Sequence, residues 1–214
     1  MNETNLTRLR ILLIAKEKFA KYDYTRVKID DIASEMGISK RTLYEYFPSK
    51  KTLLSEVLND VLNEFKTKLD EYLNSIIDKE NPDFFEALLK ILDMNFKAMT
   101  QFSKEFFEDI RKNTPEEWNK LQDFKLKQIE DKFYKMYNIG VKSGYIKSDI
   151  DKNVLFLIHY HSIQGIMQPE VITQLSLSEK EVIQNIIEIL LTGVLTDNAK
   201  EKYISKKFKK LTLT

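Results

Sequence analysis

The residues best suited to chemistry lie between positions 40 and 50, where basic and hydroxyl-bearing side chains recur at short intervals. Ammonium and guanidinium groups pair with phosphates, and hydroxyl or phenol groups hydrogen bond to phosphates or to base edges. We therefore expect a surface that contacts double-stranded DNA. Taken singly, each residue has a plainer explanation as a solvated charge or a packing side chain. The candidate residues are Lys28, Lys40, Arg41, Thr42, Tyr44, Tyr46 and Lys50.

The chain offers few groups for catalysis or metal binding. It contains no cysteine, which excludes disulfides, cysteine-based zinc sites and thiol nucleophiles. The two histidines, His159 and His161, are two positions apart and point away from each other on a helix, so they cannot chelate one metal together. Paired carboxylates such as Glu116 and Glu117 stand at a predicted helix start, where they favour the helix dipole. We expect no enzymatic activity, no metal and no cofactor.

The composition favours long helices joined by short connections. Only 5 glycines and 4 prolines occur in 214 residues, and no alternating strand pattern is present. We expect an all-α fold with a three-helix DNA-binding domain at residues 1–49 and a helical effector-binding and dimerisation domain at residues 50–214. Charge supports this division, because residues 1–51 hold 11 Lys and Arg against 7 Asp and Glu, whereas residues 52–196 hold 17 against 24.

Two short helices flank a turn in the basic region. Apolar spacing predicts a first helix to about Tyr22, a second over about residues 30–36 and a third from Ser39 to Tyr46. Gly37 is expected to end the second helix in the left-handed conformation, and Ser39 to cap the third. This spacing predicts a helix-turn-helix, whose second helix enters the major groove.

Six longer helices follow this region. Ser49 is expected to cap the first of them, Asn81-Pro82 to begin the second, and a capping box of Thr114 and Glu117 to begin the fourth, with Pro115 at its first position. The predicted ranges are about 50–77, 81–99, 104–112, 115–141, 151–172 and 179–196.

The last two predicted helices are apolar on more than one side. A helix that is apolar nearly all round must be covered nearly all round, so we expect one face to pack within the chain and another against a second copy. Central burial within one chain is the alternative. The expected dimer-interface residues are Leu155, Ile158, Ser162, Gly165, Ile166, Ile183, Ile187, Leu190 and Val194.

Aromatic side chains are dense in the middle of the chain. Most must belong to the core, but some are expected to line a pocket for a small hydrophobic effector. The candidate pocket residues are Phe96, Met99, Phe106, Trp118, Phe133 and Tyr137.

Residues 11–53 resemble the DNA-binding domain of the tetracycline-repressor (TetR) family. The residues that carry the resemblance are Ile11-Leu12, Ala15 and Phe19 in the first helix, Ile32-Ala33 and Gly37-Ile38-Ser39 in the second helix and turn, and Thr42-Leu43-Tyr44-Glu45-Tyr46-Phe47, Ser49-Lys50 and Leu53 beyond it. Two positions depart from the family pattern: Asp23 stands where glycine is usual, and Lys28 where serine or threonine caps the second helix.

The resemblance implies a homodimer of about nine helices per chain, with DNA read by the third helix and a small effector bound inside the C-terminal domain. The last two helices of each chain would form a four-helix interface. The expected function is a repressor that a small molecule releases from a palindromic operator. Two alternatives remain: an effector-independent DNA-organising or division-associated protein, and a helical lipid- or small-molecule-binding module with a vestigial helix-turn-helix.

The sequence gives no sign of export or membrane insertion. Its start lacks a charged segment followed by an apolar block, and its apolar stretches are well short of the ~20 residues that span a bilayer. We therefore expect a cytoplasmic protein with no membrane partner.

Overall fold

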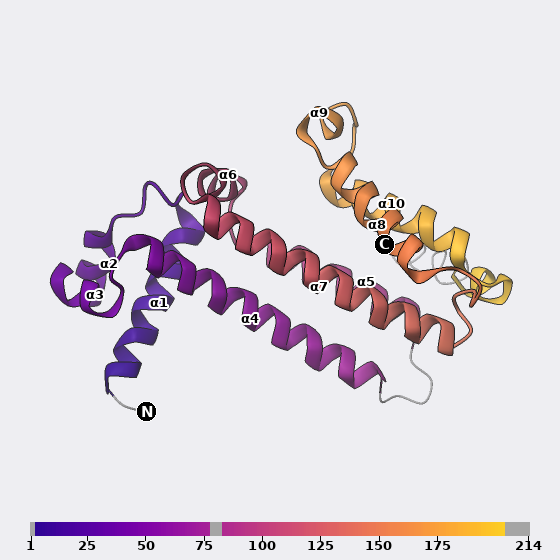
Figure 1. Ribbon diagram of the computed structural model, residues 1–214, viewed down its shortest axis with the longest axis horizontal. Helices are drawn as coiled ribbons and strands as arrows, with labels where there is room; N and C mark the ends of the chain where they lie inside the picture. Colours follow the sequence, from indigo (N-terminus) through magenta and orange to yellow (C-terminus); the bar gives the residue numbers. More distant parts are fainter. Residues whose placement is uncertain (1–2, 78–82, 204–214) are drawn as a thin grey trace, which may run out of the picture. The chain divides into compact units, whose positions relative to one another are not determined.

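The computed structural model describes residues 3–77 and 83–203, and helices dominate this part of the chain (Figure 1). In chain order the helices are α1 (Glu3–Lys21), α2 (Ile29–Met36), α3 (Lys40–Tyr46), α4 (Lys50–Ile77), α5 (Phe84–Met99), α6 (Lys104–Asn113), α7 (Pro115–Lys142), α8 (Lys152–Ile166), α9 (Pro169–Ile172) and α10 (Glu179–Val194). The predicted all-α class is confirmed, and the β pairing in the described residues is one isolated bridge between Ile146 and Leu195. None of the described helices is long and apolar enough to cross a membrane.

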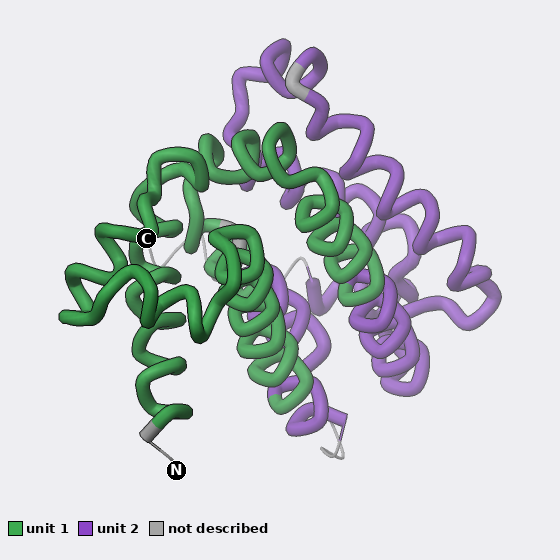
Figure 2. Tube along the Cα trace, turned by 60° about the vertical axis from the view of Figure 1, so that its left-hand side comes forward, with its two compact units in different colours: residues 1–71, 94–128 green, residues 72–93, 129–214 purple. Residues whose placement is uncertain are grey.

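The chain forms two compact units (Figure 2). The first comprises residues 1–71 and 94–128, and the second comprises residues 72–93 and 129–214. The predicted DNA-binding domain, residues 1–49, lies wholly in the first unit. That unit extends further because the first part of α4 and all of α6 share its core.

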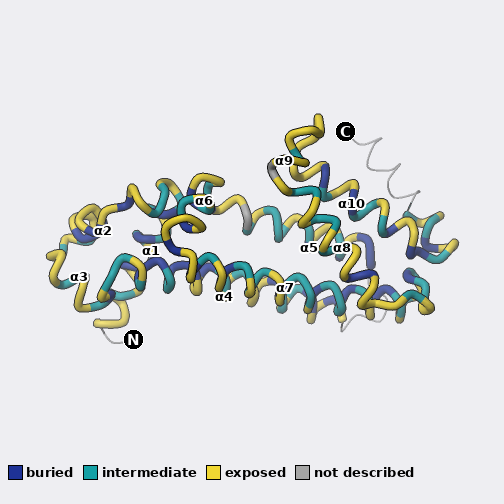
Figure 3. Tube along the Cα trace, turned by 45° about the horizontal axis from the view of Figure 1, so that its top comes forward, coloured by how far each residue is buried: buried dark blue, intermediate teal, exposed yellow. Residues whose placement is uncertain are grey.

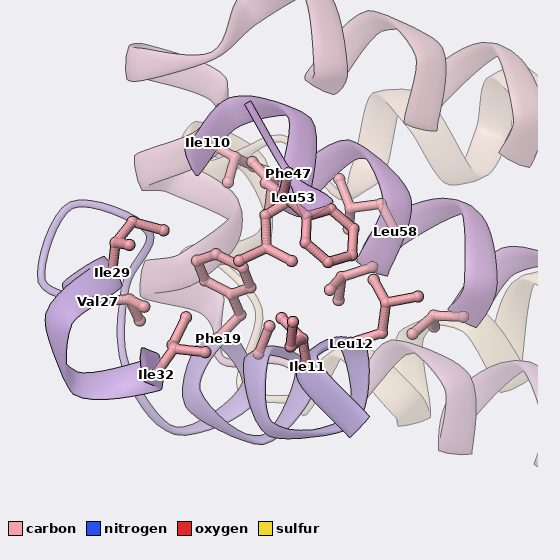
Figure 4. Close-up of a cluster of buried hydrophobic side chains, with 14 of the residues drawn as sticks. Ile11, Leu12, Phe19, Val27, Ile29, Ile32, Phe47, Leu53, Leu58 and Ile110 are labelled. Carbon is pink, nitrogen blue, oxygen red and sulfur yellow. The ribbon is translucent and has the colours of Figure 1, made fainter. Parts of the chain in front are cut away.

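An apolar cluster holds the first unit together, and Figure 4 shows many of its side chains converging. Phe19 of α1, Leu43 of α3, Leu53 of α4 and Phe106 of α6 are all fully buried in it. Each large apolar side chain buried in this way contributes roughly 1.5–3 kcal/mol relative to an exposed one. The three helices of the DNA-binding domain are therefore packed on a base made by α4 and α6.

Several predicted helix boundaries are confirmed. Gly37 ends α2 with a φ of 69°, in the left-handed region. The Ser39 hydroxyl accepts the amide N–H of Thr42 at 3.0 Å and so caps α3. Helix α4 follows directly on Ser49, and α7 begins at Pro115. The expected start of α5 at Asn81-Pro82 lies outside the described residues.

The predicted capping box at the start of α7 is wrong. The amide N–H and the hydroxyl of Thr114 both donate to the Ile110 carbonyl of α6, at 2.8 and 3.0 Å. The Glu117 carboxylate instead accepts the Ser55 hydroxyl at 3.0 Å and lies 3.6 Å from the Lys51 ammonium, both on α4. Packing against α4 therefore determines the contacts of Glu117.

The predicted single helix over residues 151–172 is also wrong, because it is divided. Helix α8 ends at Ile166, and the four-residue α9 begins at Pro169. The residue before a proline disfavours the helical conformation, which accounts for the break at Met167 and Gln168.

A short pairing closes the second unit. Gly144 turns the chain after α7 with a φ of 71°. The Lys147 amide then donates to the Val194 carbonyl, and the Thr196 amide donates to the Tyr145 carbonyl, both at 3.0 Å. The chain thus leaves this point, forms α8 to α10, and returns to it.

Gly140 of α7 occupies a place in the second unit where no side chain fits. A Cβ atom there would lie 2.6 Å from Ile146 Cδ1 and 2.9 Å from Phe84 Cε2. We expect Gly140→Val to lower the free energy of unfolding by about 2 kcal/mol, because overpacking forces neighbours aside. Urea denaturation measures this loss. Asn138→Val, which places valine on the exposed side of α7, is the matched control, and an equal loss there would contradict the packing argument.

Candidate nucleic-acid interface

The turn between α2 and α3 is set by local contacts. The Ile38 amide donates to the Ala33 carbonyl at 3.0 Å, which closes the end of α2 around Gly37. Ala33 is buried, and its small side chain allows α2 and α3 to approach closely. Leu43 faces inward from α3 and is fully buried. These contacts fix α3 and leave its other side open, as Figure 3 shows.

The open side of α3 carries Lys40, Arg41, Tyr44 and Glu45, all exposed. The Arg41 side chain is 92% exposed and lies 3.7 Å from the Glu45 carboxylate. The Lys40 ammonium donates to Asp30 at 2.9 Å, and this hydrogen bond raises the pKa of Lys40. Exposed ion pairs of this kind contribute little stability, so both cations can exchange their carboxylates for phosphates at small cost.

Lys28 lies at the start of α2 and is exposed. Its backbone is extended, with φ −103° and ψ 140°, and its side chain makes no capping bond to α2. The departure from the family pattern at this position thus leaves α2 without a side-chain cap. The Lys28 ammonium stands at a helix N-terminus, a position that favours a bound phosphate.

The other three candidates are half-buried and already have contacts within the chain. The Thr42 hydroxyl lies 2.8 Å from that of Ser39, and Tyr46 packs against the apolar cluster. The Lys50 ammonium lies 4.4 Å from the centre of the Tyr24 ring and donates to the Thr25 carbonyl at 3.3 Å. Burial lowers the pKa of Lys50. One of its three N–H donors is used by Thr25, which leaves others for a phosphate.

A polar network absent from the sequence prediction holds the segment between α1 and α2. The Thr25 amide and hydroxyl donate to the two carboxylate oxygens of Asp109, on α6, at 2.6 and 2.8 Å. Asn113 donates to Asp109 at 2.5 Å. Burial alone would raise the pKa of Asp109, but these hydrogen bonds and the nearby Lys50 lower it below its usual value. Asp109 is 84 residues from Thr25, and no local pattern in the sequence signals their contact.

The six candidate pocket residues fall in both units. In the first unit, Phe106 is fully buried and stacks on Phe102, with ring centres 4.6 Å apart, so it is a core residue. Trp118 packs against the apolar cluster, and Phe96 is half-buried. The side chain of Met99 lies outside the described part. The members in the second unit are Phe133 and Tyr137.

In the second unit, Phe133 stacks on His159 at 5.6 Å, and the Tyr137 hydroxyl donates to the Ile150 carbonyl at 2.6 Å. Burial lowers the pKa of His159, so its neutral form is favoured. No group of three or more metal-ligating side chains occurs among the described residues.

Helices α8 and α10 carry apolar side chains that are exposed within the described part of the chain. Val154, Ile158 and Ile189 are 55%, 46% and 72% exposed. On α8, residues 154, 158, 161 and 165 recur at helical spacing, and a Cβ atom on Gly165 would meet nothing within 4 Å. Of the predicted interface residues, Leu155 and Val194 are buried within the chain, Ile158 and Gly165 are exposed, and the others are half-buried. Those half-buried residues are Ser162, Ile166, Ile183, Ile187 and Leu190.

Comparison with known proteins places these features in context. Residues 11–57 match the model for bacterial regulatory proteins of the tetR family. The chain is similar to the uncharacterized HTH-type transcriptional regulator YvaF of Bacillus subtilis, with 23% identity over 79% of this chain and 86% of that one.

Solved structures share the fold. A regulator from Saccharomonospora viridis in complex with choline has a TM-score of 0.61 and 22% identity, covering 90% of this chain and 99% of that one. The regulator FadR of Bacillus subtilis in complex with stearoyl-CoA has a TM-score of 0.56 and 17% identity, covering 87% and 98%.

Proposed function

Because residues 11–57 match the model for bacterial regulatory proteins of the tetR family, we propose that the chain is a regulator of this family, and that it is a dimeric repressor that a small molecule releases from a palindromic operator. The observation that carries the proposal is the open face of α3. This face presents Lys40, Arg41 and Tyr44 from a helix that the apolar cluster and the Gly37 turn hold in place.

Each residue of this face has a chemical role in the proposal. Arg41 and Tyr44 reach base edges in the major groove, where a guanidinium can bond a guanine through two donors. Lys28 and Lys40 bind phosphates and so fix the position of α3 on the duplex without reading sequence. Lys50 adds a phosphate contact from the start of α4, through the N–H donors that Thr25 leaves.

The open surface of α8 and α10 supports a homodimer. Exposed Val154, Ile158 and Ile189 gain by being covered, and a second copy of the same surface is the simplest cover under two-fold symmetry. Two copies would present two α3 helices, and an operator with two half-sites one helical turn apart matches that arrangement.

A small-molecule effector is the least constrained part of the proposal. Two regulators with this fold hold ligands of opposite charge, stearoyl-CoA and choline. Their presence supports an effector in this chain too, but their likeness does not indicate which chemistry it has. Effector binding would favour a conformation whose α3 helices miss successive major grooves.

The first experiment measures binding of the protein to the DNA upstream of its own gene as salt is varied. We expect tight binding to a palindrome and a steep fall in affinity with salt, because phosphate contacts release counterions. Arg41→Ala should weaken binding about tenfold and relax sequence preference. Arg111→Ala, an exposed arginine on α6, is the matched control and should bind like the unaltered protein. Equal binding to unrelated DNA would contradict the proposal and favour an effector-independent, DNA-organising role.

A further inference from the structure

The inward side of α7 carries a lysine where an apolar residue would pack. In the first unit, Glu117, Leu121 and Gln128 mark the buried side of this helix, with exposed fractions of 4, 3 and 6%. Lys125 lies four positions after Leu121 and three before Gln128, so it begins on the same side. It is half-buried, whereas Lys120 and Lys127 on the same helix are exposed.

The Lys125 ammonium has an aromatic neighbour but no counter-ion. It lies 5.0 Å from the centre of the Phe107 ring on α6. Phe107 in turn contacts Phe106 and Phe102, with ring centres 5.6 and 6.1 Å away. Within the described residues no carboxylate pairs with Lys125. Burial lowers the pKa of Lys125, and no neighbouring charge offsets the effect.

Glu117, the buried carboxylate of α7 in this unit, has cationic partners. The Glu117 carboxylate lies 3.6 Å from the Lys51 ammonium and 3.5 Å from that of Lys120, and it accepts a hydrogen bond from Ser55. A buried charge without a partner is costly, and proteins pair such charges or replace them. Unlike Glu117, the half-buried Lys125 cation has no ionic partner among the described residues.

We propose that Lys125 binds the acidic head group of the effector, and that the effector is a carboxylate carried on an apolar chain or ring system. One ammonium balances the single charge of one carboxylate, whereas a phosphate monoester carries a charge of about −1.5 to −2 at pH 7 and would be left partly unbalanced. The aromatic side chains around Phe107 favour an apolar remainder. The inference rests on the proposed function, since it gives that function's effector a charge and a class.

The test uses the fluorescence of Trp118, the single tryptophan, which lies seven residues before Lys125 and so about 10 Å along the helix axis. The full-length protein is titrated with dodecanoate, dodecan-1-ol and dodecyltrimethylammonium, each below its micelle concentration. We expect dodecanoate to bind at least about tenfold more tightly than the alcohol, because only the carboxylate forms the ion pair, and the cation to bind least. Octanoate to hexadecanoate extend the carboxylate series.

Two variants separate binding from packing. Lys125→Met keeps the length of the side chain and removes its charge, and it should lower dodecanoate affinity about tenfold while alcohol affinity changes less than about twofold. Lys127→Met, on the exposed side of α7, should match the unaltered protein. The thermal midpoint of ligand-free Lys125→Met should be equal or higher, since an unpaired charge has been removed.

The proposal is overturned if no carboxylate of the series binds, if the alcohol or the cation binds as well as dodecanoate, or if Lys125→Met binds dodecanoate unchanged. A loss of thermal stability in Lys125→Met with unchanged binding would assign Lys125 to packing. Operator binding is measured on the same preparations. If operator binding is retained but no carboxylate binds, only the proposed class of effector is contradicted. If operator binding is absent, the proposed function itself is contradicted.

Discussion

Ile158→Glu should convert the dimer to a monomer and weaken operator binding more than about 100-fold. Ile158 is 46% exposed on α8, and a charge there would be buried without a partner in a two-fold interface. In the proposed function operator affinity depends on the dimer, because a monomer would contact one half-site and lose the second set of contacts. Size-exclusion chromatography with light scattering measures the mass, and DNA titration measures the affinity.

The control for this variant is Leu126→Glu. Leu126 is an exposed apolar residue of α7, 36% exposed, outside the surface of α8 and α10. The Leu126→Glu variant should leave the mass in solution and the operator affinity unchanged. Ile158→Val, which stays apolar, should keep the dimer. A dimer that survives Ile158→Glu would place the interface elsewhere and remove the argument from the open face.

Asp109→Ala should lower the free energy of unfolding by about 2 kcal/mol and operator affinity about tenfold. The variant removes the acceptor of two hydrogen bonds from Thr25 and one from Asn113. A hydrogen bond to a charged group contributes a net free energy of about 1.5–3 kcal/mol, and the total is smaller here because Thr25 is exposed to solvent. Operator affinity falls because the Thr25 carbonyl also accepts a hydrogen bond from the Lys50 ammonium. Loss of Asp109 therefore loosens both the segment before α2 and the start of α4. Denaturation and DNA titration measure the two losses.

The stabilising effect of Asp109 depends on pH. Because the folded-state pKa of Asp109 is lowered, its stabilising effect is fully present above the unfolded pKa of about 4 and is lost as pH falls through the folded value. The gap in stability between the unaltered protein and Asp109→Ala should therefore narrow below about pH 4. Glu108→Ala, at the exposed neighbouring position, should show no such gap. Asp109→Ala with unaltered DNA affinity would limit the network to stability.

The helix-turn-helix could be predicted because its determinants act over a few residues. Gly37 ends α2 and Ser39 caps α3 through contacts within five positions of each residue. Leu43, one of the residues that carry the family resemblance, is fully buried on the inward side of α3. Where no distant segment competes for the same groups, local capping and helical period can therefore be recognised from the sequence.

The errors arise where a distant segment competes with a local pattern. Glu117 has the spacing of a capping box, but Ser55 and Lys51 of α4 take its carboxylate. The contact of the Lys50 ammonium with the Tyr24 ring likewise joins segments that are distant in the sequence, and the phosphate contact expected of Lys50 stays a prediction. The division between α8 and α9 has a local cause, since Pro169 disfavours the helical conformation at the residue before it.

The pairing of residues 145–147 with 194–196 also has a consequence for folding kinetics. The two paired segments are joined through α8 to α10, so the hydrogen bonds from the Lys147 amide to Val194 and from the Thr196 amide to Tyr145 close a loop of about fifty residues. Closing a long loop costs chain entropy that only later contacts repay, which places this step after the helices themselves have formed. The amide protons of Lys147 and Thr196 should then gain protection from hydrogen exchange late in refolding, and their exchange rates record when the excursion through α8, α9 and α10 has closed.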